Sequence, residues 1–326
     1  MATSDSQRLR RLLGLFSGDD KLLIVINADP DAMASAMALK RLLWRQAANI
    51  SIAHVNEISR PDNWAMIRLV KLNLSPLSTV ELDAFSRFAI VDSQPKHHEG
   101  FQGIDFDIVI DHHPDSGIKA PFVDIRPEYG AVSTIMTKYL RAAKIKPSVR
   151  LATALFYGVK TDTSNFERQV VLDDVNAFQF LFRYANVQMA RRIEEAELSL
   201  ESLSYYQKAL RDMRVKQHRA YVHLGPVKSP DICVSIADFF MKVHDVVWSI
   251  VSGTCQGRLV IIVRNDGFRK DAGKLLSKAF GEKGSAGGHK TMARAEIQLK
   301  NLEGVVNYKN AKAVSDWIFH SLAEGT

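Results

Sequence analysis

Apolar and polar residues alternate along this chain in blocks that have the lengths of strands and helices. Residues 22–26 (LLIVI) form an uninterrupted apolar run rich in β-branched side chains, which is typical of a strand buried on both faces. The acidic segment 27–31 (NADPD) ends this run, and the small side chains that follow as far as residue 46 predict a closely packed helix. We expect further strands over 49–55, 88–91 and 106–110, and further helices over 61–70, 129–143 and 149–161. This alternation predicts an α/β fold in which a parallel sheet is connected by helices.

The second half of the chain has a different organisation. From about residue 178 to residue 217 the pattern is helical, and its later part is heavily charged, as expected of an exposed connecting helix. A second series of strands and helices follows, and it contains the glycine-rich loop 281–295 before a last strand over 296–299. We therefore predict three parts: an N-terminal domain over 1–190, a helical linker over 191–218, and a smaller α/β domain over 219–326.

Composition narrows the class of protein. The chain has 326 residues, of which 46% are hydrophobic and 24% charged, as in ordinary globular proteins. Its two cysteines, Cys233 and Cys255, lack the spacing of a zinc site or a disulfide framework. No apolar run approaches the roughly 20 residues that span a bilayer, and the N-terminus is too polar for a signal peptide. We expect a cytoplasmic protein without a membrane partner.

The net charge of +7 is unevenly distributed. Residues 256–300 contain ten Lys or Arg against four Asp or Glu, an excess of six. A positive surface there would attract a phosphate-bearing partner. A solvated basic face without a partner is the alternative.

Acidic and histidine-bearing loops follow several of the expected strands and helices. They contain Asp29 and Asp31, Asp92, the triplet Asp111-His112-His113, and Asp162. Loops at the carboxyl ends of parallel strands meet at one edge of the sheet. Carboxylates and a neutral imidazole at such an edge can hold two divalent cations, an arrangement suited to phosphoester hydrolysis. The alternative for the first pair is that one Asp caps the helix and the other is solvated.

These segments resemble the motifs of the DHH phosphoesterase superfamily, in the RecJ-like branch that has a C-terminal DHHA1-type domain. The matching segments are NADPDAMASAMAL, VDSQP, DHHP, GVKTDTSNF and the late loop SAGGHKTMARA. The resemblance implies an N-terminal parallel-sheet DHH domain with helices on both faces, joined by a long helix to a DHHA1-type domain. This branch includes nano-RNases that degrade short oligoribonucleotides and 3′-phosphoadenosine-5′-phosphate. Family II pyrophosphatases share the first domain, but their second domain lacks a Gly-Gly-His loop.

The resemblance also implies the roles of individual residues. The metal ligands would be Asp29, Asp31, Asp92, His112 and Asp162, with Asp92 bridging two metals. The implied catalytic residues are Asp92, through the metals that it bridges, and His113. His113 would contact the scissile phosphate rather than a metal. The implied substrate-binding residues are Arg264, Gly287, Gly288 and His289. Glycines allow close approach of a phosphate to the backbone, and an arginine can bind phosphate through two hydrogen bonds.

One residue departs from the family pattern. The family carries a histidine four residues before the first Asp of motif one, and this chain has Val25 there. We therefore expect one tight and one weak site for Mn²⁺ or Mg²⁺, because the oxygen-rich ligand set suits these ions.

The expected function is metal-dependent hydrolysis of a short single-stranded oligonucleotide or a phosphorylated nucleotide. The alternatives are a degenerate nucleotide-binding or nucleotide-sensing protein, and a phosphohydrolase acting on pyrophosphate, polyphosphate or a cyclic dinucleotide. The sequence leaves open the physiological substrate, the cleavage polarity, whether the chain with Val25 binds one metal or two, and whether it is a monomer or a homodimer.

Overall fold

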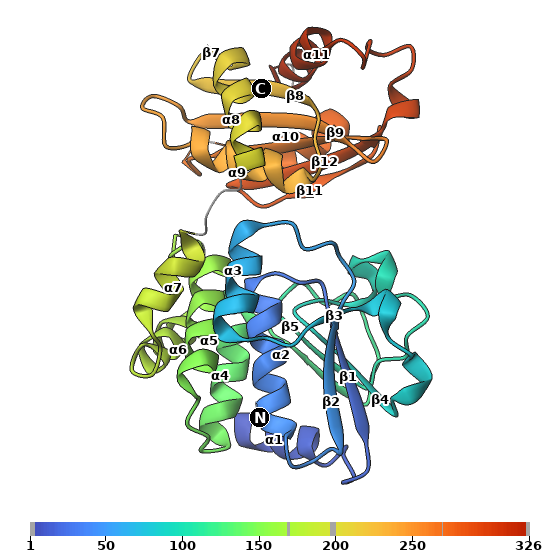
Figure 1. Ribbon diagram of the computed structural model, residues 1–326, viewed down its shortest axis with the longest axis vertical. Helices are drawn as coiled ribbons and strands as arrows, with labels where there is room; N and C mark the ends of the chain where they lie inside the picture. The colour runs from blue at the N-terminus through green and yellow to red at the C-terminus, as the bar shows by residue number, and fades with distance from the viewer. Residues whose placement is uncertain (1–3, 168–169, 196–199, 269, 324–326) are drawn as a thin grey trace. The chain divides into compact units, whose positions relative to one another are not determined.

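The computed structural model describes residues 4–167, 170–195, 200–268 and 270–323. The chain divides into two compact units, Met1–Glu197 and Leu198–Thr326 (Figure 1). The segment expected as one helical linker contains the end of α7 (Val187–Glu194), then α8 (Leu200–Asp212) and the short strand β7 (Arg214–Lys216). Residues 196–199, between the two helices, lie outside the described residues.

The first unit is built on a six-stranded sheet in which every neighbouring pair is parallel. The strand order is β3-β2-β1-β4-β5-β6. The strands are β1 (Lys21–Ile26), β2 (Asn49–His54), β3 (Ser75–Pro76), β4 (Arg87–Val91), β5 (Ile108–Asp111) and β6 (Phe122–Ile125). The apolar run over 22–26 is fully buried in β1 near the middle of the sheet, as its composition predicts. The two edge strands, β3 and β6, were not expected from the sequence.

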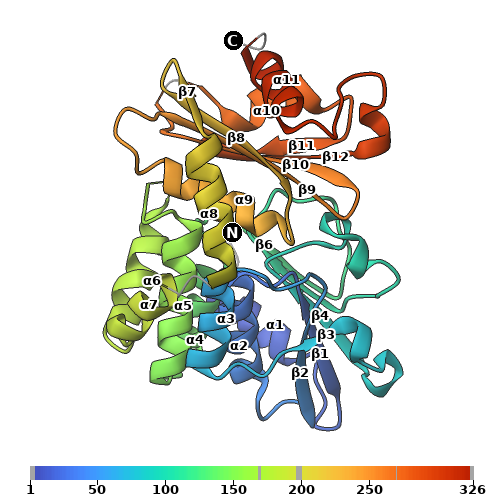
Figure 2. The ribbon, with the colours of Figure 1, turned by 45° about the horizontal axis from the view of Figure 1, so that its top comes forward.

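The α-helices of the first unit lie on one side of this sheet (Figures 1 and 2). They are α1 (Asp5–Leu13), α2 (Pro30–Leu43), α3 (Pro61–Val70), α4 (Val132–Ala142), α5 (Val149–Asp162), α6 (Leu172–Phe182) and α7. The other side is covered by the segments around residues 77–106, which contain four short 3₁₀ turns (Leu77–Thr79, Leu82–Ala84, Pro95–His97 and Glu99–Phe101). The expectation of α-helices on both faces therefore holds on one side of the sheet, and on the other side the described residues form only 3₁₀ turns and loops.

The second unit has a mixed sheet with helices on both faces. Its strand order is β11-β12-β10-β9-β8-β7, and only β8 and β9 run parallel among the described pairs. The further elements are β8 (Arg219–Pro226), α9 (Pro230–Phe240), β9 (Trp248–Cys255), β10 (Arg258–Asn265), α10 (Ala272–Phe280), β11 (Ser285–Gly288), β12 (Met292–Gln298) and α11 (Ala311–Ala323). Helices α10 and α11 share one apolar cluster with the sheet, and α8 and α9 share another. Part of the glycine-rich loop is thus an edge strand, β11.

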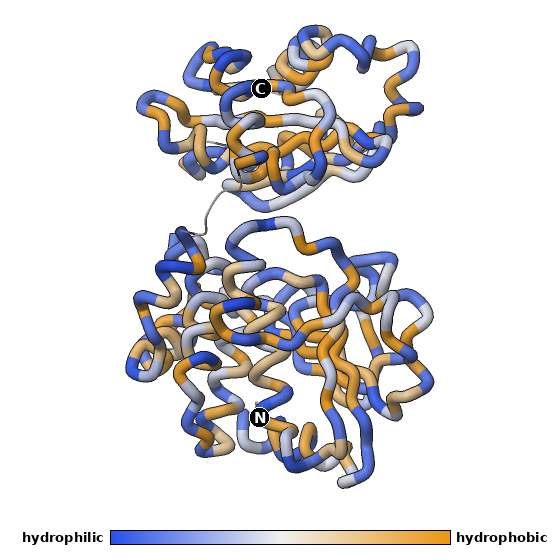
Figure 3. The backbone as a smooth tube through the Cα atoms, in the orientation of Figure 1, coloured by the Kyte–Doolittle hydropathy of each residue, from blue (hydrophilic) through white to orange (hydrophobic). Residues whose placement is uncertain are grey.

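Chain order explains where the first unit can hold a ligand. From β1 the chain proceeds outward to β2 and β3, and it then returns to the other side of β1 for β4, β5 and β6. Such a reversal opens a crevice at the carboxyl ends of the central strands. Figure 3 shows hydrophobic residues concentrated along the strands of both units, and polar residues in the loops that follow them. Within the described part of the chain, no helix is both long enough and apolar enough to cross a bilayer.

Candidate metal centre and substrate hollow

Four side chains of the first unit meet at the carboxyl edge of its sheet. Asp31 lies in the first turn of α2, Asp92 directly follows β4, His112 directly follows β5, and Asp162 is the last residue of α5. Each offers one ligand atom, and these four atoms all lie within 4.8 Å of one another. The first and last members of this group, Asp31 and Asp162, are 131 positions apart in the sequence. The fold thus brings four distant residues into a group of the size that binds one metal ion.

The imidazole of His112 is oriented for coordination through Nε2. Its Nδ1 lies 3.0 Å from the carbonyl oxygen of Tyr129, so Nδ1–H donates to that carbonyl. Its Nε2 lies 3.1 Å from Asp162 Oδ2 and 3.4 Å from Asp92 Oδ1. A hydrogen bond of this kind on one ring nitrogen is the usual support of a histidine that ligates metal through the other.

The electrostatics of this group favour a bound cation. Burial and the charge of Asp162 raise the pKa of Asp29 to about 6 and that of Asp31 to about 7. Burial and the charge of Asp29 also raise the pKa of Asp92 well above its ordinary value. Burial alone lowers the pKa of His112, but the hydrogen bond and charge of Asp162 raise it to about 9. These shifts show that the group holds more buried negative charge than its surroundings compensate. A bound divalent cation would compensate that charge.

Asp92 has two further features of a ligand. Its φ is +59°, in the left-handed region, which a non-glycine residue adopts at a cost in free energy. Among the described residues, no hydrogen bond reaches the buried atom Asp92 Oδ1, which lies 3.4 Å from His112 Nε2. Buried polar atoms normally have partners, so this oxygen beside the imidazole nitrogen fits a divalent cation held by both residues.

Backbone amides fix the orientation of the Asp31 carboxylate. Its carboxylate accepts hydrogen bonds from the amides of Val132, at 2.6 Å, and Ser133, at 2.8 Å, in the first turn of α4. Gly158 of α5 packs against it, since a Cβ at that position would lie 2.5 Å from Ser133 Oγ and 3.0 Å from Asp31 Oδ1. The small side chains of α2 and this glycine let α2, α4 and α5 approach closely enough to bury the ligand.

Asp29 lies beside the four-residue group rather than within it. Its Oδ1 caps α2 by accepting a hydrogen bond from Ala32 N at 2.8 Å. The preceding residue, Ala28, is held by the side chain of Asn56, which accepts from its amide at 2.6 Å and donates to its carbonyl at 3.1 Å. Val25 is completely buried in an apolar cluster with Leu23 and other side chains, so it adds no polar atom.

His113 is held by Asp111, whose role the motif alone did not indicate. Asp111 accepts from His113 Nδ1 at 2.9 Å and from the His112 amide at 2.8 Å, and its other oxygen accepts from Gln94 Nε2 at 2.7 Å. Burial raises the pKa of Asp111, but the hydrogen bonds from His113 and Gln94 outweigh burial and hold the pKa at about 2. The exposed ring of His97 lies 5.3 Å from that of His113. Sequence reasoning missed Gln94 and His97; their signal was the polar run that follows Asp92.

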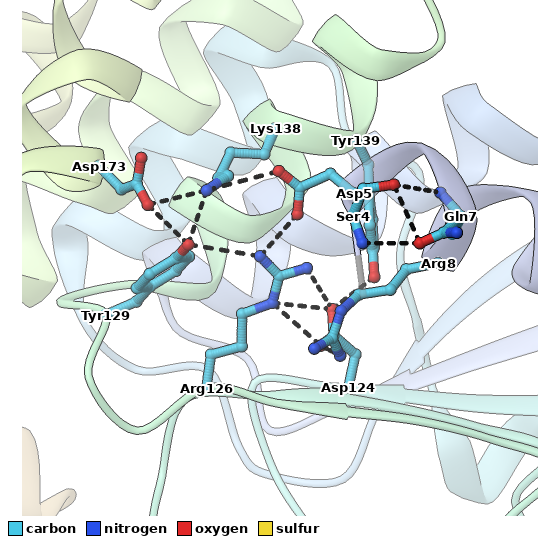
Figure 4. Close-up of polar contacts among 10 residues, drawn as sticks. All are labelled: Ser4, Asp5, Gln7, Arg8, Asp124, Arg126, Tyr129, Lys138, Tyr139 and Asp173. Atoms are coloured by element: carbon cyan, nitrogen blue, oxygen red, sulfur yellow. Dashed lines mark hydrogen bonds and ion pairs between the residues drawn. The ribbon is translucent and has the colours of Figure 1, made fainter. Parts of the chain in front are cut away.

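A polar network supports the acceptor of His112 (Figure 4). The hydroxyl of Tyr129 donates to Asp173 at 2.8 Å and accepts from Lys138 at 2.7 Å, and Arg126 Nη1 lies 3.4 Å from the same hydroxyl. Arg126 is itself paired with Asp124 at 2.8 Å. These contacts fix the Tyr129 segment, whose carbonyl orients the metal-facing histidine. No local pattern predicts this network, since its members come from β6, the loop that follows it, α4 and α6.

The residues expected to bind substrate lie together in the second unit. Arg264, Gly287, Gly288 and His289 line a hollow of about 430 Å³. Gly288 has a φ of +147°, and a Cβ there would lie 2.3 Å from the Met292 carbonyl oxygen, so the fold itself requires this glycine. Gly287 has no such restriction, because its nearest neighbour would be Ser277 Oγ at 3.8 Å.

The cations of this hollow have acidic partners. Arg264 donates through Nε to Asp238 at 2.6 Å, and Arg294 pairs with Glu296 at 2.5 Å. The expected site residues therefore form two groups, one in each unit.

Comparison with known proteins gives the family. Residues 21–159 match the DHH family, N-terminal domain. These residues therefore form a DHH-family N-terminal domain. The match ends three residues before Asp162, which the structure places with the other members of the group.

Similarity to a curated relative extends beyond the length of the first unit. An uncharacterized protein of Methanocaldococcus jannaschii is 36% identical over 279 residues, which are 85% of this chain and 58% of that protein. A probable manganese-dependent inorganic pyrophosphatase of Deinococcus radiodurans is 30% identical over 172 residues, 50% of this chain and 52% of that protein. The chain thus spans little more than half the length of these curated relatives.

A solved structure shares the fold of both units. It is the crystal structure of an exopolyphosphatase-related protein from Bacteroides fragilis, with a TM-score of 0.76. The match covers 97% of this chain and 96% of that one at 16% identity. The DHH domain of this chain is therefore followed by a second α/β domain.

Proposed function

We propose that this DHH protein hydrolyses a phosphoester of a short single-stranded oligonucleotide or a phosphorylated nucleotide in a reaction that depends on a divalent metal. The observation that carries this proposal is the group of Asp31, Asp92, His112 and Asp162, whose ligand atoms lie within 4.8 Å of one another. The buried Asp92 Oδ1, which accepts no hydrogen bond from the described residues, supports a cation at this position.

The oxygen-rich donor set favours Mn²⁺ or Mg²⁺ over zinc. The Deinococcus relative, named as a probable manganese-dependent enzyme, supports manganese. When bound, such an ion supplies positive charge to the attacked phosphoryl group and lowers the pKa of a bound water. We propose one tight site at the four-residue group and a weaker one near Asp29 and Asp92, because Val25 provides no ligand there.

The chain's own residues divide the remaining work. Asp111 accepts a hydrogen bond from Nδ1–H of His113, and in the protonated form of this ring Nε2–H would donate to a non-bridging oxygen of the scissile phosphate. Arg264 and His289 in the second unit would bind a phosphate or base away from the bond that is cleaved. Arg264 retains donor groups beyond the Nε atom that contacts Asp238.

A substrate panel with Mn²⁺ tests the proposal. The probes are the dinucleotide pApA, 3′-phosphoadenosine-5′-phosphate, cyclic di-AMP, tripolyphosphate and pyrophosphate. We expect the first two to be hydrolysed fastest, and no product from any probe in EDTA. Preferred turnover of tripolyphosphate or pyrophosphate would replace the proposed substrate with a phosphoanhydride. Tight nucleotide binding with no turnover at any Mn²⁺ concentration would identify a sensor rather than an enzyme.

A further inference from the structure

A second hollow opens in the first unit at the carboxyl end of β2. It has a volume of about 790 Å³ and is formed by the end of β2, the segment that follows it, α3, and the region of β3. This volume lies in the range of sites that enclose a small organic molecule. None of the residues assigned to metal or phosphate lines this hollow.

The hollow adjoins both loops that carry the central carboxylates. Asn56, in its wall, makes the two hydrogen bonds to Ala28 that fix the residue before Asp29. Gly100, also in the wall, belongs to the segment that follows Asp92, and it packs so tightly that a Cβ there would lie 2.9 Å from Val55 Cβ. The hollow therefore shares, through Asn56 and Gly100, the loops that follow β1 and β4 and carry Asp29 and Asp92.

The walls suit an uncharged ring system and not a chain of phosphates. The twelve described residues that line the hollow include no lysine or arginine, and their one acid is Glu57. A polyphosphate or pyrophosphate tail would need cationic or amide partners. Apolar side chains dominate instead, among them Ile58, Ile67 and Leu77.

Trp64 provides a fixed aromatic surface in this wall. The residue is 56% exposed, although a large aromatic side chain is normally well buried. Its Nε1–H donates to the Ile58 carbonyl at 2.8 Å, so the polar edge is satisfied and the orientation of the ring is set. His54 adds a polar group, because its Nδ1–H donates to the Asn56 carbonyl at 2.6 Å and leaves Nε2 as an acceptor. An oriented aromatic face with a nearby acceptor is the usual recognition chemistry for a nucleobase.

We propose that this hollow binds a nucleoside of the substrate, with the base stacked on Trp64, while the adjoining phosphate occupies the metal centre. The proposal rests on the proposed phosphoesterase function and narrows it, because it selects nucleotide substrates over pyrophosphate and polyphosphate. Trp64 is then a specificity-determining residue that takes no part in metal binding.

The test compares Trp64→Ala with two controls. Trp64→Phe keeps an aromatic face, and Trp44→Ala removes another exposed tryptophan, at the end of α2 and outside the hollow. Stacking of one base supports an increase of about five- to a hundredfold in the KM for pApA in Trp64→Ala. We expect unchanged kcat and Mn²⁺ affinity in that variant, partial recovery in Trp64→Phe, and wild-type behaviour in Trp44→Ala.

Binding of AMP, measured by titration calorimetry with Mn²⁺ and with EDTA, tests the nucleoside site separately from the phosphoesterase function. If the wild-type protein hydrolyses pApA but Trp64→Ala keeps the same KM and the same AMP affinity, the nucleoside site is wrong and the phosphoesterase stands. If no phosphoester is hydrolysed, the proposed function is wrong, and AMP binding that weakens in Trp64→Ala alone still supports the hollow. Wild-type protein that binds AMP under neither condition would overturn the nucleoside site.

Discussion

The metal centre of the first unit and the hollow of the second unit handle charge in opposite ways. In the first unit, Asp31 and Asp92 are buried close to one another, and burial and neighbouring acids raise the pKa of each. In the second, Arg264 and Arg294 each contact a carboxylate at 2.6 Å or less. The first arrangement requires an added cation, and the second is already neutralised. Charge that is left uncompensated thus marks the place for the metal more clearly than the overall positive charge marks the place for phosphate.

The largest effect should come from removing one of the crowded carboxylates. Asp92→Asn keeps a side chain that tolerates the left-handed backbone but removes the central negative charge. We expect hydrolysis to fall by about a thousandfold or more, because the metal loses a ligand to which the chemistry is coupled. In EDTA the same variant should be more stable than wild type, by on the order of 1–3 kcal/mol, since repulsion among buried acids is relieved. Steady-state kinetics with pApA and Mn²⁺ check the loss of hydrolysis, and calorimetric unfolding in EDTA checks the gain in stability. Lower stability of Asp92→Asn than of wild type in EDTA would contradict the repulsion among buried acids.

The second unit contains a buried neutral histidine, His223, whose protonation should destabilise the fold at low pH. Burial, with a smaller contribution from the charge of Lys208, lowers the pKa of His223 from 6.5 to about 4. Because the unfolded chain binds the proton more readily, the stabilising effect is complete above pH 6.5 and is lost as the pH falls toward 4. The loss should reach about 3 kcal/mol. Chemical denaturation of wild type and His223→Gln between pH 7.5 and 4.5 measures it, and parallel curves for the two proteins would show that His223 does not titrate with unfolding.

A substitution in the second hollow should affect substrate and leave the metal untouched. His289→Ala removes one charge-assisted hydrogen bond, worth about 1.5–3 kcal/mol, which corresponds to roughly ten- to a hundredfold in kcat/KM. Lys290→Ala, one residue further along, is the matched control for loss of a cation in the same loop. Mn²⁺ titration and steady-state kinetics with pApA on both variants check this. Loss of Mn²⁺ binding in His289→Ala, or full catalytic efficiency, would refute the division of roles.

The smallest effect concerns the second metal. We expect one tight Mn²⁺ per chain and another that binds at least about tenfold more weakly, comparable to the loss of a supporting group elsewhere. Asp29→Ser keeps the cap on α2 but removes the carboxylate, so it should abolish only the weaker site. Asp29→Ala should have the same effect on the metal and cost about 1 kcal/mol of stability in addition. Titration calorimetry of the three proteins decides, and two equally tight ions in wild type would exclude the unequal pair.

The fold could be read from the sequence where burial leaves a simple pattern. The apolar run of β1 and the helix over 61–70 are such cases, and the match to a DHH-type two-domain structure confirms the fold class. Strand β3 has two residues and β6 alternates with a buried Asp124, so neither leaves a recognisable apolar run. Helix α11 was not predicted, although its apolar residues Val314, Ile318 and Leu322 repeat at helical spacing and are buried.

The candidate site divides in the same manner. Loops after strands identified the acidic residues, because chain order alone brings strand ends to one edge. The groups that orient these acidic residues and His112 could not be predicted from the sequence. The Tyr129 carbonyl and the Asn56 side chain act through tertiary hydrogen bonds that no local pattern encodes. The metal roles of the residues themselves stay predictions.

The two-residue strand β3 has a consequence for assembly. Exposed sheet edges are templates on which other chains can add strands and aggregate. Here the outermost strand pairs through only two positions, and its second residue is Pro76, which has no amide hydrogen to donate. That margin of the first unit is a poor template for strand addition, so fibre-like self-association through β3 is disfavoured. A homodimer of this chain would not join two copies of this edge into one continuous sheet.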